Sequence, residues 1–262
     1  MEWNQLRAQN ALLERRQQLV GAFKAAITKV KKSLSALGCC ELCGLDMPVD
    51  LASSFNQQLI CPHCIEALPL FNQDLVYSDL LTWPAINKAL PKIEFDHLFS
   101  LAPYIHPFDR LIPQFKYHGR FELGHTFASI LANEWQLSAY LKSPNAIVAV
   151  PLHIKKWQKR GYNQAHLLAK HFAQSIEVPY FACAITRVKN TESQMGKVGA
   201  ARRQNLKSAF TLNQKFHGID HVLLIDDVVT TGTTASEISK LLKSSGVKTV
   251  TLVTVCLSLP KG

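Results

Sequence analysis

The sequence predicts an α/β protein built on a parallel, doubly wound sheet, and three observations support this. Continuous apolar runs occur at residues 146–152 and 222–225, as is typical of strands that are covered on both faces. A further strand at residues 247–257 is expected to close the sheet. Amphipathic helical patterns lie between the runs, at residues 163–176 and after residue 234. Strands that alternate with helices form parallel sheets, which bind ligands at the carboxyl ends of their strands.

The remaining elements of this domain are less regular in pattern. Strands are also expected near residues 95–105 and 180–188, and helices at residues 109–118, 121–141 and 202–208. Between the strand at 146–152 and the helix at 163–176, residues 154–161 are strongly basic and are expected to form a loop. These elements place the α/β domain at residues 95–262.

The stretch from Val222 to Thr234 joins a strand, an acid pair and a small-residue loop. Asp226 and Asp227 follow the apolar run, and the loop contains Thr230, Thr231, Gly232, Thr233 and Thr234. Loop amides and the first N–H groups of a helix attract anions, so the loop predicts a phosphate site. The stretch has neither the lysine of a Walker loop nor the glycines of a dinucleotide fingerprint. A simpler interpretation is a strand that merely ends in two acids.

A phosphate close to a vicinal diol would use both halves of this stretch, because the carboxylates can accept hydrogen bonds from the hydroxyls. A 5-phosphoribosyl group has that shape. The thirteen residues resemble the phosphoribosyl-pyrophosphate motif of type I phosphoribosyltransferases, which implies that Asp226, Asp227 and Thr230–Thr234 bind the phosphoribosyl group.

Two further segments are candidates for the same site. A pyrophosphate or other anion could be held by a basic loop made of Lys155, Lys156, Arg160, Gly161, Asn163 and Gln164. A polar, glycine-containing stretch at residues 189–205 carries Lys197 and Arg202 and is expected to form a mobile loop that closes over ligand. The alternatives are a solvated basic turn and an ordinary flexible connection.

Five of the seven cysteines cluster near the N-terminus. Cys40 and Cys43 form one pair with two intervening residues, and Cys61 and Cys64 form another. This spacing predicts a structural zinc ribbon rather than disulfides. Cys39 or His63 could replace one of the four ligands, and reduced thiols without metal are the alternative.

The N-terminal residues 1–37 predict one basic helix with an apolar seam, including Leu6, Leu13 and Val20 at seven-residue intervals. The seam could pair in a coiled coil or pack on the body, whereas the lysines could contact nucleic acid or an anionic membrane. The expected organisation is a basic helix at residues 1–38, the ribbon at 39–68, a linker at 69–94 and the α/β domain at 95–262.

Charge and hydropathy limit the functional classes. The net charge is +10, and no window is apolar enough for a membrane span. No uninterrupted apolar segment of signal-peptide type begins the chain, so a cytoplasmic protein is expected. A basic body suits a phosphate-rich ligand or nucleic acid, and charge alone does not choose between them.

The whole pattern resembles the competence protein ComF family, which is phosphoribosyltransferase-like and includes the GntX-type bacterial proteins. The matching residues are the two cysteine pairs, Phe115-Lys116-Tyr117, Val150-Pro151-Leu152, Arg160-Gly161-Tyr162-Asn163-Gln164, Gln194, Arg202, Asn205, Ala209-Phe210 and the stretch ending at Thr234. The resemblance covers residues 40 to about 257. The basic helix precedes it, and residues 65–182 lack the further cysteine pairs that many members carry.

The resemblance implies a type I phosphoribosyltransferase-like fold and a role in natural transformation or nutrient DNA use. The implied partners are a phosphoribosyl pyrophosphate-like ligand, single-stranded DNA and the DNA-uptake machinery, such as a helicase or channel. The competing hypothesis is an active, Mg²⁺-dependent transferase with a nucleobase or amine acceptor. The sequence shows no segment for that acceptor, so binding is favoured over turnover.

Overall fold

The computed structural model describes residues 38–47, 59–90, 92–138, 144–188 and 209–258. The chain divides into two compact units, residues 1–64 and 65–262, which are described separately. The predicted helix at residues 1–37 and the predicted closing loop, with Lys197 and Arg202, lie outside the described residues.

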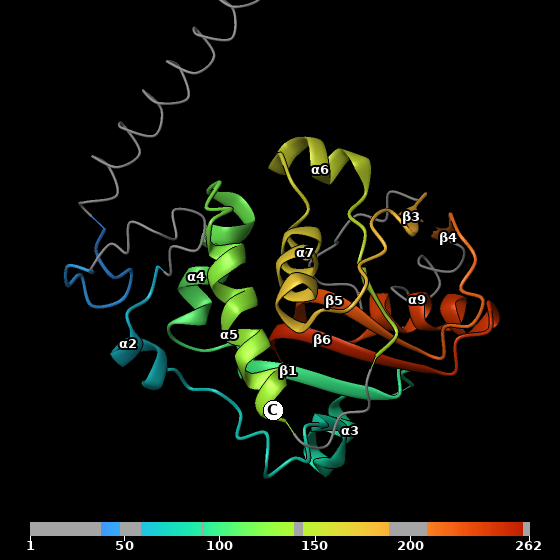
Figure 1. Ribbon diagram of the computed structural model, residues 1–262, viewed down its shortest axis with the longest axis horizontal. Coiled ribbons are helices and arrows are strands. Elements are labelled where there is room, and N and C mark those ends of the chain that lie inside the picture. The colour runs from blue at the N-terminus through green and yellow to red at the C-terminus, as the bar shows by residue number, and fades with distance from the viewer. Residues whose placement is uncertain (1–37, 48–58, 91, 139–143, 189–208, 259–262) are drawn as a thin grey trace, which may run out of the picture. The chain divides into compact units, whose positions relative to one another are not determined.

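A four-stranded sheet forms the centre of the second unit (Figure 1). Its strands lie in the order β1 (His97–Pro103), β6 (Thr249–Leu257), β5 (His221–Val229) and β2 (Ala146–Ala149). Every neighbouring pair is parallel, so the carboxyl ends of all four strands lie at one edge. The predicted parallel sheet is confirmed.

Helices cover both faces of this sheet, as the doubly wound prediction requires. On one face, Trp135 of α5 (Leu123–Leu137) packs edge-on against Phe99 of β1 and Phe172 of α7 (Gln164–Ile176). Leu98 belongs instead to the core cluster that contains Ile238 of α9 (Thr233–Ser244). Because successive strand residues point to opposite faces, α9 covers the face away from α5 and α7.

Shorter elements complete the second unit. They are η1 (Leu80–Thr82), α3 (Pro84–Ala89), α4 (Phe108–Tyr117), α6 (Ile154–Arg160), β3 (Ile185–Arg187) and β4 (Phe210–Leu212). The segment expected to be a linker carries η1 and α3, and its Val76, Leu80 and Ile86 are buried in the same core cluster as β5 and α9. This segment therefore contributes to the hydrophobic core.

Two local predictions were wrong. Residues 154–160 form the helix α6 rather than a loop, because the His153 side chain accepts a hydrogen bond at its start and Gly161, at φ 82°, ends it. The strand expected at 180–188 is only β3, which pairs antiparallel with β4 in a separate two-stranded sheet. Cys183, at φ 57°, interrupts the extended backbone before it.

Two boundaries also differ from expectation. Strand β5 continues through the acid pair to Val229, because its backbone keeps pairing with β6 as far as Leu257. Helix α5 ends at Leu137, four residues earlier than expected, and residues 139–143 are outside the described part. Within the described residues, no helix combines the length and apolarity needed to cross a membrane.

Candidate functional site

The acid pair lies at the carboxyl edge of the sheet, near the end of β5. Asp226 is level with Thr254 of β6, and the backbone N–H of Asp227 donates to Asp226 Oδ1 at 2.9 Å. Asp227 is buried, with 7% of its surface exposed, whereas Asp226 is partly exposed. Successive strand residues alternate in direction, so the two carboxylates have different neighbours.

Asp227 is paired with a lysine from a distant part of the chain. Nζ of Lys116, in the last turn of α4, lies 2.9 Å from Asp227 Oδ1, and the lysine side chain is only 20% exposed. Burial would lower the pKa of Lys116, but the charge of Asp227, with Asp226 behind it, outweighs burial and raises it. The ammonium ion is therefore a fixed part of this edge.

Asp226 is the more strongly perturbed carboxyl group. Burial, followed by the nearby Asp227 carboxylate, raises the pKa of Asp226 to about 7, against the opposing effects of Lys116, the Asp227 N–H and Arg187. Arg187, at the end of β3, also lies over the ring of Phe210, with its guanidinium carbon 5.6 Å from the ring centre. The charges of Lys116 and Arg187 thus both oppose the rise in the pKa of Asp226, and Lys116 has the larger effect.

Neither Lys116 nor Arg187 is among the site residues predicted from the sequence. A signal for Lys116 was available, because it follows Ile112 by four residues and so lies on the buried side of α4. A lysine on an apolar helical face needs a buried acid as its partner. Arg187 carried no such signal, because β3 is too short to show which face is buried.

The predicted phosphate loop connects β5 directly to α9. Thr230, Thr231 and Gly232 form the connection, and Thr233 and Thr234 belong to the first turn of the helix. The hydroxyl groups of Thr231 and Thr233 share a hydrogen bond of 2.9 Å. The acid pair and the helix N-terminus are therefore joined at one edge of the sheet, in the arrangement predicted for phosphate and diol binding.

Gly232 has a structural reason to be glycine. Its φ is 65°, and a Cβ atom there would lie 3.2 Å from side-chain atoms of both Ile93 and Phe95. This packing lies behind the loop and is separate from the surface that would face a bound phosphate. The loop is therefore supported from below by the segment that enters β1.

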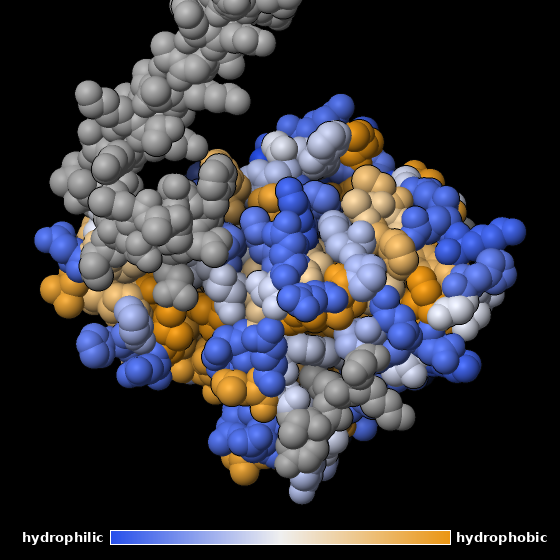
Figure 2. Space-filling model, viewed as in Figure 1, coloured by the Kyte–Doolittle hydropathy of each residue, from blue (hydrophilic) through white to orange (hydrophobic). Residues whose placement is uncertain are grey.

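The predicted anion-binding residues divide into two groups. Lys155 and Lys156 project from α6, where hydrophilic residues gather on the surface (Figure 2). Asn163 is engaged within the fold, because its Nδ2 donates to Val150 O at 3.1 Å and its Oδ1 accepts from Ala165 N at 3.1 Å.

The Arg-Gly-Tyr-Asn-Gln motif binds the end of α4. The Tyr162 hydroxyl donates to Phe115 O, and Gln164 Nε2 lies 3.4 Å from Phe115 O and 3.5 Å from Lys116 O. Arg160 donates to the Tyr117 hydroxyl at 3.3 Å and to Gln164 Oε1 at 3.1 Å. Side chains of the motif thus satisfy the last carbonyl groups of α4, which lack partners within the helix.

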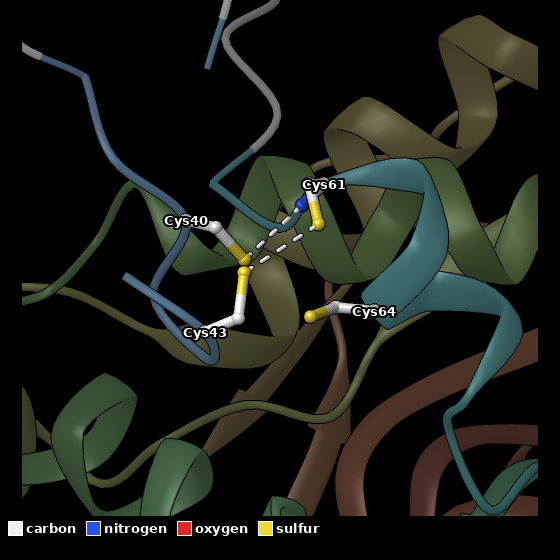
Figure 3. Close-up of side chains that lie close together, drawn as sticks. All are labelled: Cys40, Cys43, Cys61 and Cys64. Atoms are coloured by element: carbon white, nitrogen blue, oxygen red, sulfur yellow. Dashed lines mark hydrogen bonds between the residues drawn. The ribbon is translucent and has the colours of Figure 1, made fainter. Parts of the chain in front are cut away.

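The first unit contains a cluster of four cysteines. The sulfur atoms of Cys40, Cys43, Cys61 and Cys64 lie within 4.8 Å of one another and turn toward a common centre (Figure 3). Cys43 Sγ and Cys61 Sγ are 3.8 Å apart, close to the separation of two sulfurs in a tetrahedral site with metal–sulfur bonds of about 2.3 Å. The cluster could hold a metal ion.

The backbone favours a thiolate at Cys40, whereas burial and the neighbouring cysteines raise the pKa of Cys64 to about 12. Burial alone would raise the pKa of Cys40, but backbone N–H groups of Cys61, Cys43 and Leu42 outweigh it and lower the pKa to about 6. Gly44, at φ 72°, closes the first turn with a hydrogen bond from its N–H to Cys40 O. Among the described residues, the cluster contains neither Cys39 nor His63. The second pair lies at the start of α2 (Pro62–Glu66).

Comparisons with known proteins agree with this architecture. A model of the phosphoribosyl transferase domain family matches residues 159–261. Competence protein F of Haemophilus influenzae is 39% identical over 162 residues, which are 60% of this chain and 70% of that protein. The chain belongs to the competence protein F family. Its cysteine cluster and parallel sheet show the family's ribbon-like N-terminal region and type I phosphoribosyltransferase-like fold.

Other relatives match over a longer part of the chain. The DNA utilization protein YhgH of Salmonella typhimurium is 31% identical over 237 residues, covering 89% of this chain and 96% of that protein. A more distant likeness is to adenine phosphoribosyltransferase from Leishmania tarentolae, with 15% identity and a TM-score of 0.35 over 54% of this chain and 73% of that one.

Proposed function

We propose that this family member binds phosphoribosyl pyrophosphate, or a related phosphoribosyl ligand, at the carboxyl edge of its sheet. Asp226 and Asp227 would accept hydrogen bonds from the ribose hydroxyls, and the loop Thr230–Thr234 would hold the 5-phosphate. The observation that carries this proposal is the direct connection from the acid pair, through three loop residues, to the N-terminus of α9. Phosphate groups bind at such helix N-termini.

The basic segment would supply the remaining charge for a polyanionic ligand. Lys155 and Lys156 lie on α6. Arg160, Asn163 and Gln164 form hydrogen bonds within the fold and would act by fixing the backbone around Gly161. The predicted closing loop with Lys197 and Arg202 remains part of this proposal, on the basis of its sequence.

We further propose that the biological role is DNA uptake or nutrient use of DNA, through binding of single-stranded DNA. The relatives' names, competence protein F and DNA utilization protein, support that role. On α6, Trp157 is 49% exposed among lysines, which suits base stacking beside phosphate contacts. Tyr162 packs against Phe115 and Phe121 within the fold.

An active transferase is the alternative, and a pocket beside the phosphate loop favours it. The pocket has a volume of about 380 Å³ and is lined by Lys92, Glu94, Thr231, Thr233, Ser236, Glu237 and Lys240. It offers space for a nucleobase or amine acceptor next to a bound phosphoribosyl group. Mg²⁺ would have to be coordinated by oxygen atoms of the ligand, because Asp227 already forms an ion pair with Lys116. When bound, it would offset the pyrophosphate charge.

For the cysteine cluster, we propose a structural zinc ion held by Cys40, Cys43, Cys61 and Cys64. Four sulfur atoms close enough for tetrahedral coordination support this choice, since thiolates favour zinc. A site with four protein ligands leaves no open position for chemistry. The zinc would therefore stabilise the first unit.

A calorimetric titration with phosphoribosyl pyrophosphate and Mg²⁺ tests the pocket. Wild type should bind, and the Asp226→Asn/Asp227→Asn double variant should bind at least tenfold more weakly. Lys243→Met removes a lysine that pairs with Asp96 at 2.7 Å, away from the acid pair, and serves as the control. Equal binding by wild type and the double variant would show that the pocket assignment is wrong.

Titration of a single-stranded oligonucleotide at several salt concentrations tests the DNA proposal. Affinity should fall steeply as salt increases, because phosphate contacts release counterions. The Lys155→Ala/Lys156→Ala double variant should have a smaller salt slope, and Trp157→Ala should weaken binding with little change in slope. Salt-independent binding contradicts the DNA proposal and leaves the phosphoribosyl proposal intact.

A further inference from the structure

Lys116 is placed where a ligand bound at the sheet edge would meet it. Its ammonium ion lies 2.9 Å from Asp227, which belongs to β5. Its charge also influences Tyr104, just after β1, and Cys256 in β6. Through its contact with Asp227, the lysine lies at the carboxyl edge of the sheet, where parallel sheets of this type bind their ligands.

Several side chains hold the end of α4 that carries Lys116 in place. Gln164 and Tyr162 donate hydrogen bonds to its last carbonyl groups, and the guanidinium of Arg160 stacks on Tyr117 at 4.8 Å from the ring centre. Gln164 is almost fully buried, with 1% of its surface exposed. These contacts fix the backbone on both sides of Lys116, so they fix where its side chain begins.

The acid pair repels a polyanionic ligand that binds at this edge. The ligand must approach two carboxylates, and repulsion between like charges at a few ångströms in a partly buried site is substantial. A cation within the site reduces that repulsion. Lys116 is suited to this role because it already contacts Asp227 and retains 20% exposure, from which it can turn toward ligand oxygens.

We propose that Lys116 is a ligand-binding residue of the phosphoribosyl site and that the Arg160–Gln164 motif positions it. This inference rests on the proposed phosphoribosyl function. In the absence of ligand the ammonium ion pairs with Asp227, and when ribose hydroxyls occupy that carboxylate the ammonium ion contacts the ligand's anionic oxygens. Lys116 and a divalent cation could then partly replace each other, since both offset the negative charge of the ligand and the acid pair.

The test is the affinity for phosphoribosyl pyrophosphate, measured by calorimetry in excess EDTA and again with millimolar Mg²⁺. Lys116→Met should bind at least tenfold more weakly than wild type in EDTA. One charge in contact with the ligand at an effective dielectric constant of about 20 corresponds to roughly a thousandfold at most, and breaking the Lys116–Asp227 pair on binding offsets part of that. Mg²⁺ should recover most of that loss. Lys116→Arg should lie between the two, and the remote control Lys243→Met should match wild type.

Loss of its partner leaves Asp227 buried and unpaired, so Lys116→Met could lose stability. Lys116→Gln retains a hydrogen-bond donor without charge and gives a second, better tolerated variant. The positioning role is tested with Gln164→Leu, which should show the same Mg²⁺-recoverable loss in smaller measure. In the double variant Lys116→Met/Gln164→Leu, the second change should add nothing, because Gln164 would act only through Lys116.

The outcomes separate this inference from the function on which it rests. If wild type binds ligand and the folded Lys116→Met and Lys116→Gln variants bind equally well in EDTA, the role of Lys116 is overturned and the pocket stands. If the Gln164→Leu loss adds fully to the Lys116→Met loss, the positioning role is overturned. If wild type does not bind ligand under either condition, the proposed function fails and the role of Lys116 fails with it.

Discussion

Replacing Asp226 with asparagine should remove part of the loss of stability that occurs as the pH rises toward 7. The pKa of Asp226 is raised from 3.8 to about 7 in the folded protein, because burial and Asp227 disfavour its charge. The folded state therefore binds a proton that the unfolded state has lost, and stability falls as pH rises from about 4 to 7. Above pH 7 both states are ionised, so this contribution becomes constant.

The size of the effect follows from these two pKa values. Between pH 5.5 and pH 8, a folded pKa of about 7 removes at most about 2 kcal/mol of unfolding free energy. Asp226 retains some contact with solvent, which screens its charge, so we expect about 1 kcal/mol. Asparagine keeps the Oδ1 acceptor for the Asp227 N–H and carries no charge, so the variant should not lose this amount.

Urea unfolding followed by circular dichroism at pH 5.5 and pH 8 measures the difference. The Asp226→Asn variant should gain about 1 kcal/mol relative to wild type on going to the higher pH. Asp220→Asn is the control, because Asp220 pairs with Lys248 on the surface, where both side chains are more than half exposed. If Asp226→Asn and wild type differ by the same amount at both pH values, burial beside Asp227 does not raise the pKa of Asp226.

Three other substitutions test separate parts of the structure. Metal analysis should find about one zinc ion per chain, and Cys61→Ser should lose it; a folded wild-type protein without metal would contradict the zinc proposal. Gly232→Ala should lower the unfolding free energy by about 1–3 kcal/mol, because its Cβ would press on Phe95 at positive φ; an unchanged denaturation midpoint would oppose this. Asn163→Ala removes the α7 cap and the bond to Val150 O, and should cost about 1–2 kcal/mol in the same assay, whereas Asn72→Ala, on an exposed turn, should cost less.

Continuous apolar runs made the central sheet predictable from the sequence. Apolar runs such as 222–225 have the composition of strands covered on both faces, and β5 lies there. The acid pair and the threonine loop were recognised because all their residues are adjacent in the chain. Similarly, two matched cysteine pairs predicted the cluster, since a metal site constrains local spacing.

Contacts between distant segments were not predictable in the same way. Lys116 and Asp227 are more than a hundred positions apart, and no local pattern links them. The many basic residues at 154–160 suggested a loop, because they give no clear amphipathic pattern. These seven residues form the helix α6, and His153 and Gly161 set its start and end. The role of Gln164 was not predictable either. Sequence alone does not distinguish a glutamine that donates hydrogen bonds to helix carbonyl groups from one that binds a ligand.

The strand order has a consequence for how the protein is made. Strand β6 lies between β1 and β5, yet it is the last of the four to leave the ribosome. Until residues 249–257 emerge, β1 has no neighbouring strand in this sheet, and β5 has only β2. The carboxyl edge that gathers Lys116 and Asp227 is thus assembled late in synthesis. A nascent chain stalled before β6 would expose two apolar strand edges to chaperones or to other chains.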